Sequence, residues 1–287
     1  MTTSMKNPDD VAELLRRATS GDEAALSTLV DAVRHDIYGL AMRMLGHPAD
    51  AEDATQEILI LIITHLAGFE GRSSFRTWTW KIASRHLLRV KRGRREVISF
   101  DDLDRILDEG QREGASVPLV PATSEDALYT REAKFGCTQA MLLGLDREHR
   151  VAFILCEILD LSGEEAADVL EIAPAALRKR LSRANQRLQE FMHGRCSLID
   201  EANPCQCARQ VPCAIRTGHL VPGHLLYATH PTRKGEGAAM HQSLAEVDEL
   251  QRIVGVLRGH PDYAAPDSLR DGIRSLITGG RFRILES

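Results

Sequence analysis

The sequence predicts an all-α protein: two small helical domains joined by an acidic linker, and a C-terminal extension with a cysteine-rich loop and further helices. Three observations lead to this prediction. Aromatic residues make up only 5% of the chain and its apolar residues are mostly Leu, Ile, Val and Ala, which favours helices over a β-sandwich. Apolar residues recur at helical spacing over several long stretches. Charge is segregated along the chain, so successive segments differ in sign.

The bulk properties set the class of protein. The 287 residues suffice for two or three small domains, and the longest apolar run, residues 58–63, is too short to cross a bilayer. The N-terminus has no apolar signal region. We therefore expect a cytoplasmic protein without a membrane partner, whose cysteines are thiols or metal ligands rather than disulfides. No nucleophile–base pair, phosphate-binding loop or dinucleotide fingerprint is apparent, so we expect no enzyme.

The first predicted domain covers residues 9–95. Helical spacing runs through residues 9–45 and ends at Gly46 and Pro48. A helix at about 49–66 begins with several acids, which the helix dipole favours there, and its apolar run 58–63 is expected to be buried on all sides. A loop then precedes a further helix that begins at Phe75.

This further helix is both aromatic and basic. Residues 71–95 contain nine Lys and Arg and neither Asp nor Glu. Cations neutralise phosphates and aromatic rings stack on unpaired bases, so the segment predicts contact with single-stranded nucleic acid. Trp78 pairs with Ile82 at helical spacing and is expected in the core, whereas Trp80 lies on another face and is expected to touch bases; the alternative is that all the apolar side chains are core. The candidate residues are Arg72, Ser73, Ser74, Phe75, Arg76, Trp80, Lys81 and Arg85.

The linker covers residues 96–126 and is acidic. Residues 96–130 have no sustained apolar period and contain two glycines and two prolines. This composition predicts a mostly extended connection of unusual length.

The second predicted domain, residues 127–192, ends in a helix–turn–helix. Helices are expected at about 127–143, 147–159, 164–170 and 174–192. Ser162 and Glu165 have the spacing of a capping box, which begins the third of these helices. A three-residue turn, 171–173, separates it from Pro174, which is placed as a first helical residue.

The last helix of this domain has an apolar stripe and a cationic face. The stripe is expected to face the core, and a small residue with four cations on the other side is typical of a recognition helix in a major groove. The alternative is the solvated face of an ordinary surface helix, but residues 173–189 contain no acid. The candidate residues are Ala176, Lys179, Arg180, Arg183 and Arg187.

Taken in order, these segments resemble sigma factors of bacterial RNA polymerase, of the extracytoplasmic-function type in the sigma-70 family. The resemblance covers about residues 21–192. GDEAALSTLV is similar to the opening helix and DAEDATQEIL to the acidic polymerase-docking segment. FRTWTWKIASRHLLRVKRGR resembles the promoter-melting, −10-reading segment of region 2, and LDREHRVAFILCEILDLSGEEAADVLEIAPAALRKRLSRANQRL resembles the −35-reading region 4.

The resemblance implies an alternative sigma factor that directs promoter recognition, DNA melting and transcription initiation. Its partners would be promoter DNA and core RNA polymerase, through the β′ clamp and the β flap. The residues 72–81 would hold the melted −10 element, and Lys179, Arg180 and Arg183 would contact the −35 duplex. The linker would run through the polymerase cleft. Contacts with polymerase would come from Asp50, Asp53, Gln56 and Glu57.

The sequence departs from the family in four respects. Glu171 stands in the middle of the turn, where the family usually has glycine, and His86 stands where it often has Asn. The linker is long, and the chain continues for about 95 residues past the usual end near residue 192. A second hypothesis therefore remains: a one-component helix–turn–helix regulator with a metal-sensing or redox-sensing tail.

The extension, residues 193–287, carries a cysteine-rich segment at 193–240 and expected helices within 243–278. Cys196, Cys205, Cys207 and Cys213 follow the spacing C-x8-C-x-C-x5-C, with several histidines nearby. Three hypotheses stay open: a site for Zn or Cu, a thiol redox switch, or cysteines without a special role. Cys137 and Cys156 are expected to be ordinary core residues.

Some sigma factors of this type carry fused extensions that replace a separate anti-sigma factor, and metal-responsive members have cysteine-rich ones. The tail is similar to these. The resemblance implies regulation by the tail itself, with a metal ion or an anti-sigma factor as further partners, and no required cofactor.

Overall fold

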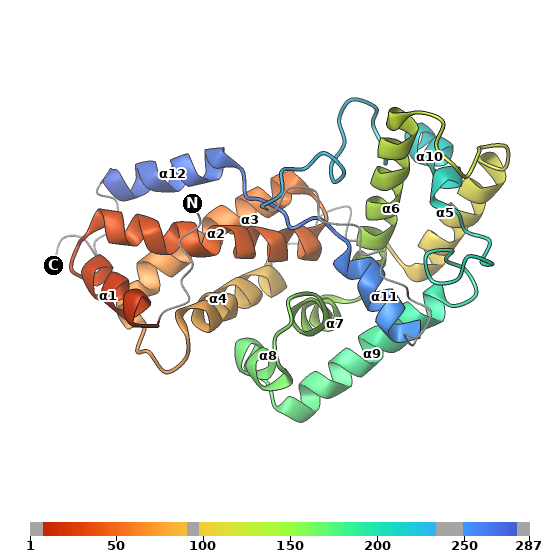
Figure 1. Ribbon diagram of the computed structural model, residues 1–287. Coiled ribbons are helices and arrows are strands. Elements are labelled where there is room, and N and C mark those ends of the chain that lie inside the picture. The colour runs from red at the N-terminus through yellow and green to blue at the C-terminus, as the bar shows by residue number, and fades with distance from the viewer. Residues whose placement is uncertain (1–7, 91–97, 234–248, 280–287) are drawn as a thin grey trace.

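The computed structural model describes residues 8–90, 98–233 and 249–279 (Figure 1). Over these residues the chain is built from helices, and the β-type pairings in this part of the chain are three isolated bridges. The all-α prediction is confirmed. No helix in the described ranges is long and apolar enough to span a membrane.

In the described residues the N-terminal unit has four α-helices, α1 (Pro8–Thr19), α2 (Glu23–Leu45), α3 (Pro48–His65) and α4 (Phe75–Arg89), and a short 3₁₀ helix η1 (Leu66–Gly68) after α3. Asp22 caps α2 at its start, and Gly46 ends it in the left-handed conformation at φ 76° that glycine adopts freely. The apolar run of α3 is buried at four of its positions, but Ile60 and Leu61 are half-buried, so the expectation of burial on every side is only partly right.

The acidic linker contains a helix, so the expectation of a mostly extended segment is wrong. Helix α5 (Phe100–Glu113) begins at a capping box between Ser99 and Asp102 and buries Phe100, Leu103 and Leu107 along one face. Its glycines are packing positions. A Cβ on Gly110 would lie 2.0 Å from the side-chain oxygen of Gln210, so the glycine allows the tail to approach α5 closely.

The C-terminal sigma-like unit comprises α6 (Ser124–Gly144), α7 (Arg147–Phe153), a π-helical turn η3 (Ile154–Ile158), α8 (Gly163–Leu170) and α9 (Pro174–Met192). The predicted helices all exist, with α6 beginning three residues earlier than expected at a Thr123 cap. Arg150, 2% exposed, donates hydrogen bonds to the backbone oxygens of Leu143 and Leu145, and also to that of Met44 in α2. The two units therefore share buried contacts.

The tail contributes three described helices. Helix α10 (Cys207–Arg216) lies inside the segment expected to be a loop, which corrects that expectation; α11 (Glu249–Arg258) and α12 (Asp267–Thr278) match the two later helices. Residues 243–248 of the first of these expected helices lie outside the described ranges.

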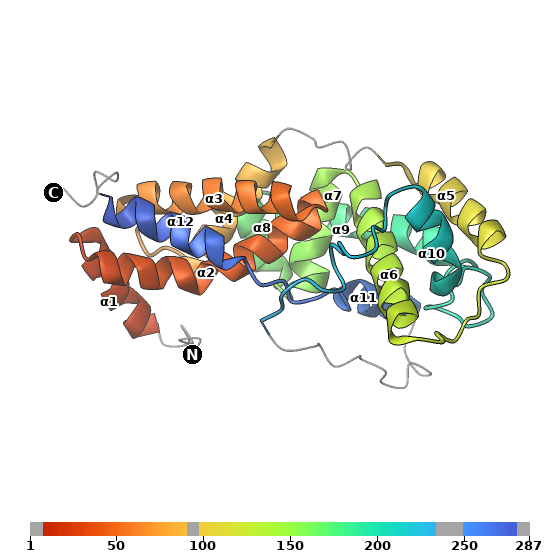
Figure 2. The same cartoon turned by 90° about the horizontal axis from the view of Figure 1, so that it is seen from above.

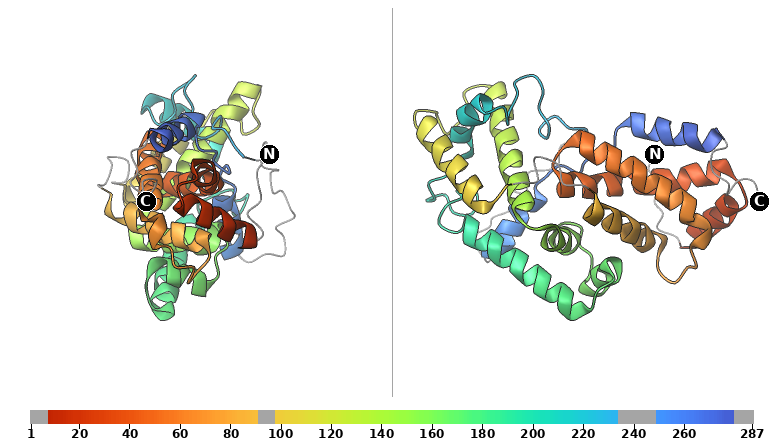
Figure 3. Two further views of the ribbon diagram at one scale, coloured as in Figure 1. Left: turned by 90° about the vertical axis from the view of Figure 1, so that its left-hand side faces the viewer. Right: turned by 180° about the vertical axis from the view of Figure 1, so that it is seen from behind.

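The molecule is elongated, and the tail extends over both units (Figures 1 and 2). Helix α10 packs between α5 and α6 at one end, α11 lies against α9, and α12 lies along α2 and α3 at the other end. Seen from behind, the same tail segments span the junction between the two units (Figure 3). The tail therefore lies across both helical units.

Candidate nucleic-acid interface

The helix–turn–helix forms as the sequence predicts, without the glycine that the turn usually has. Ser162 and Glu165 make the capping box of α8, and Pro174 is the first residue of α9. Glu171 adopts the left-handed conformation at φ 54° that glycine would adopt more easily. A non-glycine residue is disfavoured in this conformation.

The cationic face of α9 is largely open. Ala176, Lys179, Arg183 and Arg187 are exposed, whereas Leu177, Ala184 and Leu188 are buried against the core. Two of the predicted DNA contacts have protein partners: Arg180 pairs with Glu148 at 2.7 Å, and Arg187 lies over the Phe100 ring of α5 at 5.4 Å. The face is thus accessible around Lys179 and Arg183.

Of the three aromatic residues of α4, two are buried. Trp80 is 3% exposed and Phe75 4% exposed, whereas Trp78 is only half-buried, where it packs with Phe69 and Phe75. The expectation for the two tryptophans is therefore reversed: Trp80 is core and Trp78 is the more exposed. Helical spacing separates faces, but it does not say which neighbour covers each face, and here α4 packs against α2, α3, α7 and α8.

The cations of α4 are engaged with the helix–turn–helix. Lys81 pairs with Asp168 of α8 at 2.7 Å, and Arg85 pairs with Glu171 in the turn. Arg76 lies over the Trp80 ring and pairs with Asp36 at 3.2 Å, and the loop residue Arg72 pairs with Glu70. Ser74 caps α4, accepting a hydrogen bond from the Thr77 N–H, and Ser73 is half-buried beside it.

The acidic residues of α3 that are expected to contact polymerase are exposed in the described part of the chain. Asp50, Asp53, Gln56 and Glu57 are all exposed along this helix. Glu57 also lies 3.3 Å from His86, whose pKa is lowered by burial. The His86 side chain is thus a packing partner at the α3–α4 contact rather than a surface contact.

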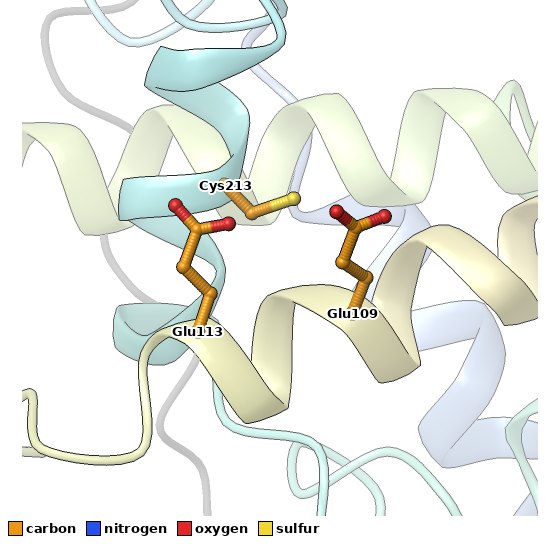
Figure 4. Close-up of side chains that lie close together, drawn as sticks. All are labelled: Glu109, Glu113 and Cys213. Carbon is orange, nitrogen blue, oxygen red and sulfur yellow. The ribbon is translucent and has the colours of Figure 1, made fainter.

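The four tail cysteines expected to act together are divided between two places. Cys196, Cys205 and Cys207 line an enclosed, mostly apolar cavity of about 20 Å³, together with Cys137 of α6. Cys213 lies instead beside Glu109 and Glu113 of α5 (Figure 4). Cys137, expected to be ordinary core, is therefore the fourth thiol of the group, and Cys213 is not.

Arg216 supplies a cation to the group formed by Cys213, Glu109 and Glu113. Arg216 donates to Glu113 at 3.0 Å, to Glu109 at 2.5 Å and to the Cys213 sulfur at 3.5 Å. The guanidinium neutralises the two carboxylates, so the group is an ion-pair network between α5 and α10.

The residues that hold the tail were missed by sequence reasoning. The Glu132 carboxylate, 3% exposed, accepts hydrogen bonds from the backbone N–H groups of Leu226, Tyr227 and Ala228. His260, 5% exposed, bonds Thr138 at 2.6 Å and Tyr263 at 2.8 Å. For Glu132, the available sequence signal was an acidic residue within a helical apolar pattern. His260 lies in a segment that has no recognisable pattern.

Two segments match known family descriptions: Sigma-70 region 2 over residues 29–97 and Sigma-70 region 4 over residues 135–188. The chain is 26% identical over 181 residues to the ECF RNA polymerase sigma factor SigW of Bacillus subtilis, covering 63% of this chain and 95% of that protein. It is 29% identical over 184 residues to the RNA polymerase sigma-H factor of Pseudomonas aeruginosa, covering 63% and 92%.

Among solved structures, CnrH in complex with the cytosolic domain of CnrY matches with 24% identity and a TM-score of 0.41, over 63% of this chain and 95% of that one. Residues 193–287 lie beyond the region 4 match. The order of regions 2 and 4, the formed helix–turn–helix and the curated relatives agree: this chain belongs to the sigma-70 family, as a sigma factor of the extracytoplasmic-function type with a C-terminal extension.

Proposed function

We propose that this chain is an alternative sigma factor that binds core RNA polymerase, recognises −10 and −35 promoter elements, and is held closed by its own tail before it is used. The observation that carries the proposal is the exposed cationic face of α9, the second helix of a formed helix–turn–helix. Promoter duplex carries dense negative charge, and cations beside a small residue fit its major groove.

The −35 contacts are assigned to this face. Lys179 and Arg183 are exposed and aligned, Ala176 leaves room for close approach near the helix start, and Arg187 reaches the flanking backbone. Arg180 contributes after it exchanges Glu148 for phosphate. Such an exchange costs little because exposed ion pairs are weak.

The −10 contacts are assigned to the polar and cationic residues before and along α4. Arg72, Ser73, Ser74 and Arg76 lie at or near its N-terminus, where unpaired N–H groups favour anions such as phosphate. Lys81 and Arg85 join them once they leave Asp168 and Glu171. Phe75 and Trp80 are core residues that pack beneath this surface and do not contact bases.

Polymerase contacts are assigned to the exposed acids of α3. The relatives SigW of Bacillus subtilis and sigma-H factor of Pseudomonas aeruginosa are named as RNA polymerase sigma factors. Asp50, Asp53, Gln56 and Glu57 form an accessible, mainly anionic strip that would suit a basic partner surface, the β′ clamp.

Closure is assigned to the tail because it binds both units. Arg258 of α11 pairs with Asp160 of the second unit at 2.6 Å. The segment that follows bonds the first unit: the Pro261 oxygen accepts from Arg43 at 3.2 Å, and the Ala265 N–H donates to His35 at 2.9 Å. With these contacts in place, α4 stays against α8 and two of its cations stay paired.

The function requires no cofactor. A zinc or copper ion at the tail cysteines, or an anti-sigma factor, would add regulation to this scheme without supplying chemistry for initiation.

Run-off transcription with core polymerase tests the proposal. We expect promoter-dependent transcripts with the full chain, and their loss in the double charge reversal Asp53→Lys with Glu57→Lys. The matched control is Glu23→Lys with Glu13→Lys, which reverses two exposed acids elsewhere in the same unit. Duplex binding that proceeds without polymerase, together with no transcript from any promoter tested, would replace the proposal with a one-component regulator.

A further inference from the structure

A second and larger cavity, of about 400 Å³, lies among α5, α6 and the tail. Helix α10 packs against both α5 and α6 in this part of the molecule (Figure 1). None of the residues assigned to DNA or polymerase lines this larger cavity. Cavities of about 300–1,000 Å³ are the usual size of small-molecule sites in proteins, so its size is that of a ligand site.

Small side chains on α6 leave this space unfilled. Four of them recur at helical spacing and line the larger cavity: Ala133, Gly136, Cys137 and Ala140. The tail is nevertheless fixed close by, because Gln210 of α10 donates a hydrogen bond to the Leu107 oxygen of α5 at 3.0 Å. The helices therefore pack around the space instead of closing it.

The walls of the larger cavity are held by buried hydrogen bonds. The Tyr227 hydroxyl donates to the Gly46 oxygen at the end of α2 at 2.7 Å. The Glu132 carboxylate accepts from the backbone N–H groups of Leu226 at 2.7 Å and Ala228 at 2.6 Å. Since these walls are formed in advance, a ligand would lose little free energy to ordering them.

One buried polar side chain of the lining has an unsatisfied atom. Gln139 is 1% exposed, and its Nε2 donates to the Arg43 oxygen at 3.0 Å. Its Oε1 is covered and accepts no hydrogen bond from the described residues. A buried amide oxygen without a donor is costly. A ligand that donates to Oε1, once the amide has turned toward the cavity, would recover this free energy.

The charge of the lining disfavours anions. No described Lys or Arg lines the larger cavity, whereas the carboxylates of Asp102 and Glu132 do. Glu132 already accepts from three backbone N–H groups and Asp102 pairs with Arg105, so neither acid requires a cation from a ligand. We propose that the larger cavity binds a neutral, mainly apolar small molecule that carries a hydrogen-bond donor.

Binding would stabilise the docked position of α10. The lining comes from α5, α6 and the segment from Gln210 to Tyr227, and these segments surround the cavity together only while α10 is packed on both helices. A ligand that binds this arrangement stabilises it over any arrangement in which α10 is released. Such a molecule would favour the closed chain; this consequence rests on the proposed function, whereas the binding site itself does not.

The test uses two related fluorescent molecules and the full chain. N-phenyl-naphthylamine is neutral and mainly apolar and carries an N–H donor, and anilinonaphthalene sulfonate adds an anionic group to the same ring system. We expect about one molecule of the neutral compound to bind per chain, about tenfold or more tightly than the sulfonate. The neutral compound should also raise the midpoint of thermal unfolding.

Cavity-filling substitutions locate the site. The double variant Ala140→Leu with Ala214→Leu adds volume from α6 and from α10, since both residues line the larger cavity. It should weaken binding of the neutral compound by about tenfold or more. The matched control is Ala127→Leu with Ala202→Leu, at two exposed positions outside the lining, and should leave binding unchanged.

Photolabelling of the wild-type chain covers the case in which the filled variant does not fold. Benzophenone, also neutral and mainly apolar, should attach within residues 98–107, 132–143 or 210–227, and excess N-phenyl-naphthylamine should prevent the attachment. The proposal is overturned if the neutral compound does not bind, if the sulfonate binds as tightly, if the folded filled variant binds unchanged, or if labelling lies elsewhere. Polymerase and promoter are absent, so failure here leaves promoter recognition standing.

Discussion

The two cationic surfaces of this chain differ in what covers them. On α9, Lys179 and Arg183 are exposed, and the described tail residues leave them so. On α4, Lys81 and Arg85 lie against α8 and pair with Asp168 and Glu171, and the tryptophan expected to reach bases is in the core. Both segments are basic and helical in the sequence. The surface proposed to bind the −35 element is therefore exposed, and the surface proposed to bind the −10 element is partly occupied by the second unit.

This difference gives the acids of the helix–turn–helix a role. Asp168 and Glu171 are acids within the helix–turn–helix, and Glu171 holds a backbone conformation that glycine would adopt more readily. Both acids pair with cations of α4. Like promoter DNA, they are anionic, so in the proposed function they would pair with the α4 cations until DNA displaces them.

The largest expected effect is a difference in the free energy of unfolding between substitutions of the two tryptophans of α4. Trp80→Ala should lower the free energy of unfolding by about 3–5 kcal/mol, because it removes a fully buried aromatic side chain. Trp78→Ala should cost clearly less, since that ring is half-buried. Chemical denaturation of both variants measures this. Equal stability of the two, with Trp80→Ala defective only in promoter melting, would return Trp80 to the DNA surface.

Much of the fold was predictable because its signals are local. The capping box at Ser162, the proline at 174 and the apolar stripe of α9 each fix backbone without distant partners. The exposed acids of α3 and the open face of α9 follow from the same patterns.

The rest depends on contacts between segments far apart in sequence. Helix α5 had a detectable signal in Phe100, Leu103 and Leu107, but its acids and glycines resemble a linker until α10 is packed against Gly110. The thiol group was inaccessible for the same reason: Cys137 is about sixty residues from Cys196 in sequence, and only the packing of the tail on α6 joins them.

Lowering the pH should weaken the contacts of the tail before it affects α9. Burial, with the charges of Arg43 and Lys134, lowers the pKa of His260 from 6.5 to about 3, so the folded chain holds this ring neutral. The stability it contributes is complete above pH 6.5 and is lost as pH falls toward 3, because the unfolded chain binds the proton first. From pH 7 to pH 5 the loss is about 2 kcal/mol.

His260→Gln removes this titration. The variant is less stable at pH 7, but its unfolding free energy should fall by about 2 kcal/mol less than that of the wild-type chain between pH 7 and pH 5. Urea denaturation at several pH values measures both slopes. Parallel slopes would show that His260 does not link acid to the tail contact.

Substitutions of two arginines of α9 test whether its exposed cationic face binds the promoter. Arg183→Ala should weaken −35 duplex binding by polymerase holoenzyme about tenfold, or about 1.4 kcal/mol. Arg178→Ala removes the same charge from an exposed position on the other flank of α9 and should have a much smaller effect. Equal losses would mean that net charge alone, and not this face, binds the promoter.

The smallest effect concerns the covered surface. Asp168→Ala and Glu171→Ala remove the anionic partners of α4, and each exposed pair contributes about 0.2–1 kcal/mol. We expect transcription at limiting sigma factor to rise about 1.5- to 5-fold. Glu164→Ala, at an exposed acid of the same helix, is the control. A decrease in the first two variants would indicate that these acids act in the open complex.

The most direct test of closure is the distance between the units, measured by single-molecule energy transfer between labels at Thr64 on α3 and Gln186 on α9, both exposed. The labels are attached through introduced non-cysteine handles, so the native thiols stay unmodified. The free chain should give one short-distance population, and core RNA polymerase should convert it to a longer distance as α4 leaves α8. The same distance in both states, or a long distance in the free chain, would contradict closure by the tail.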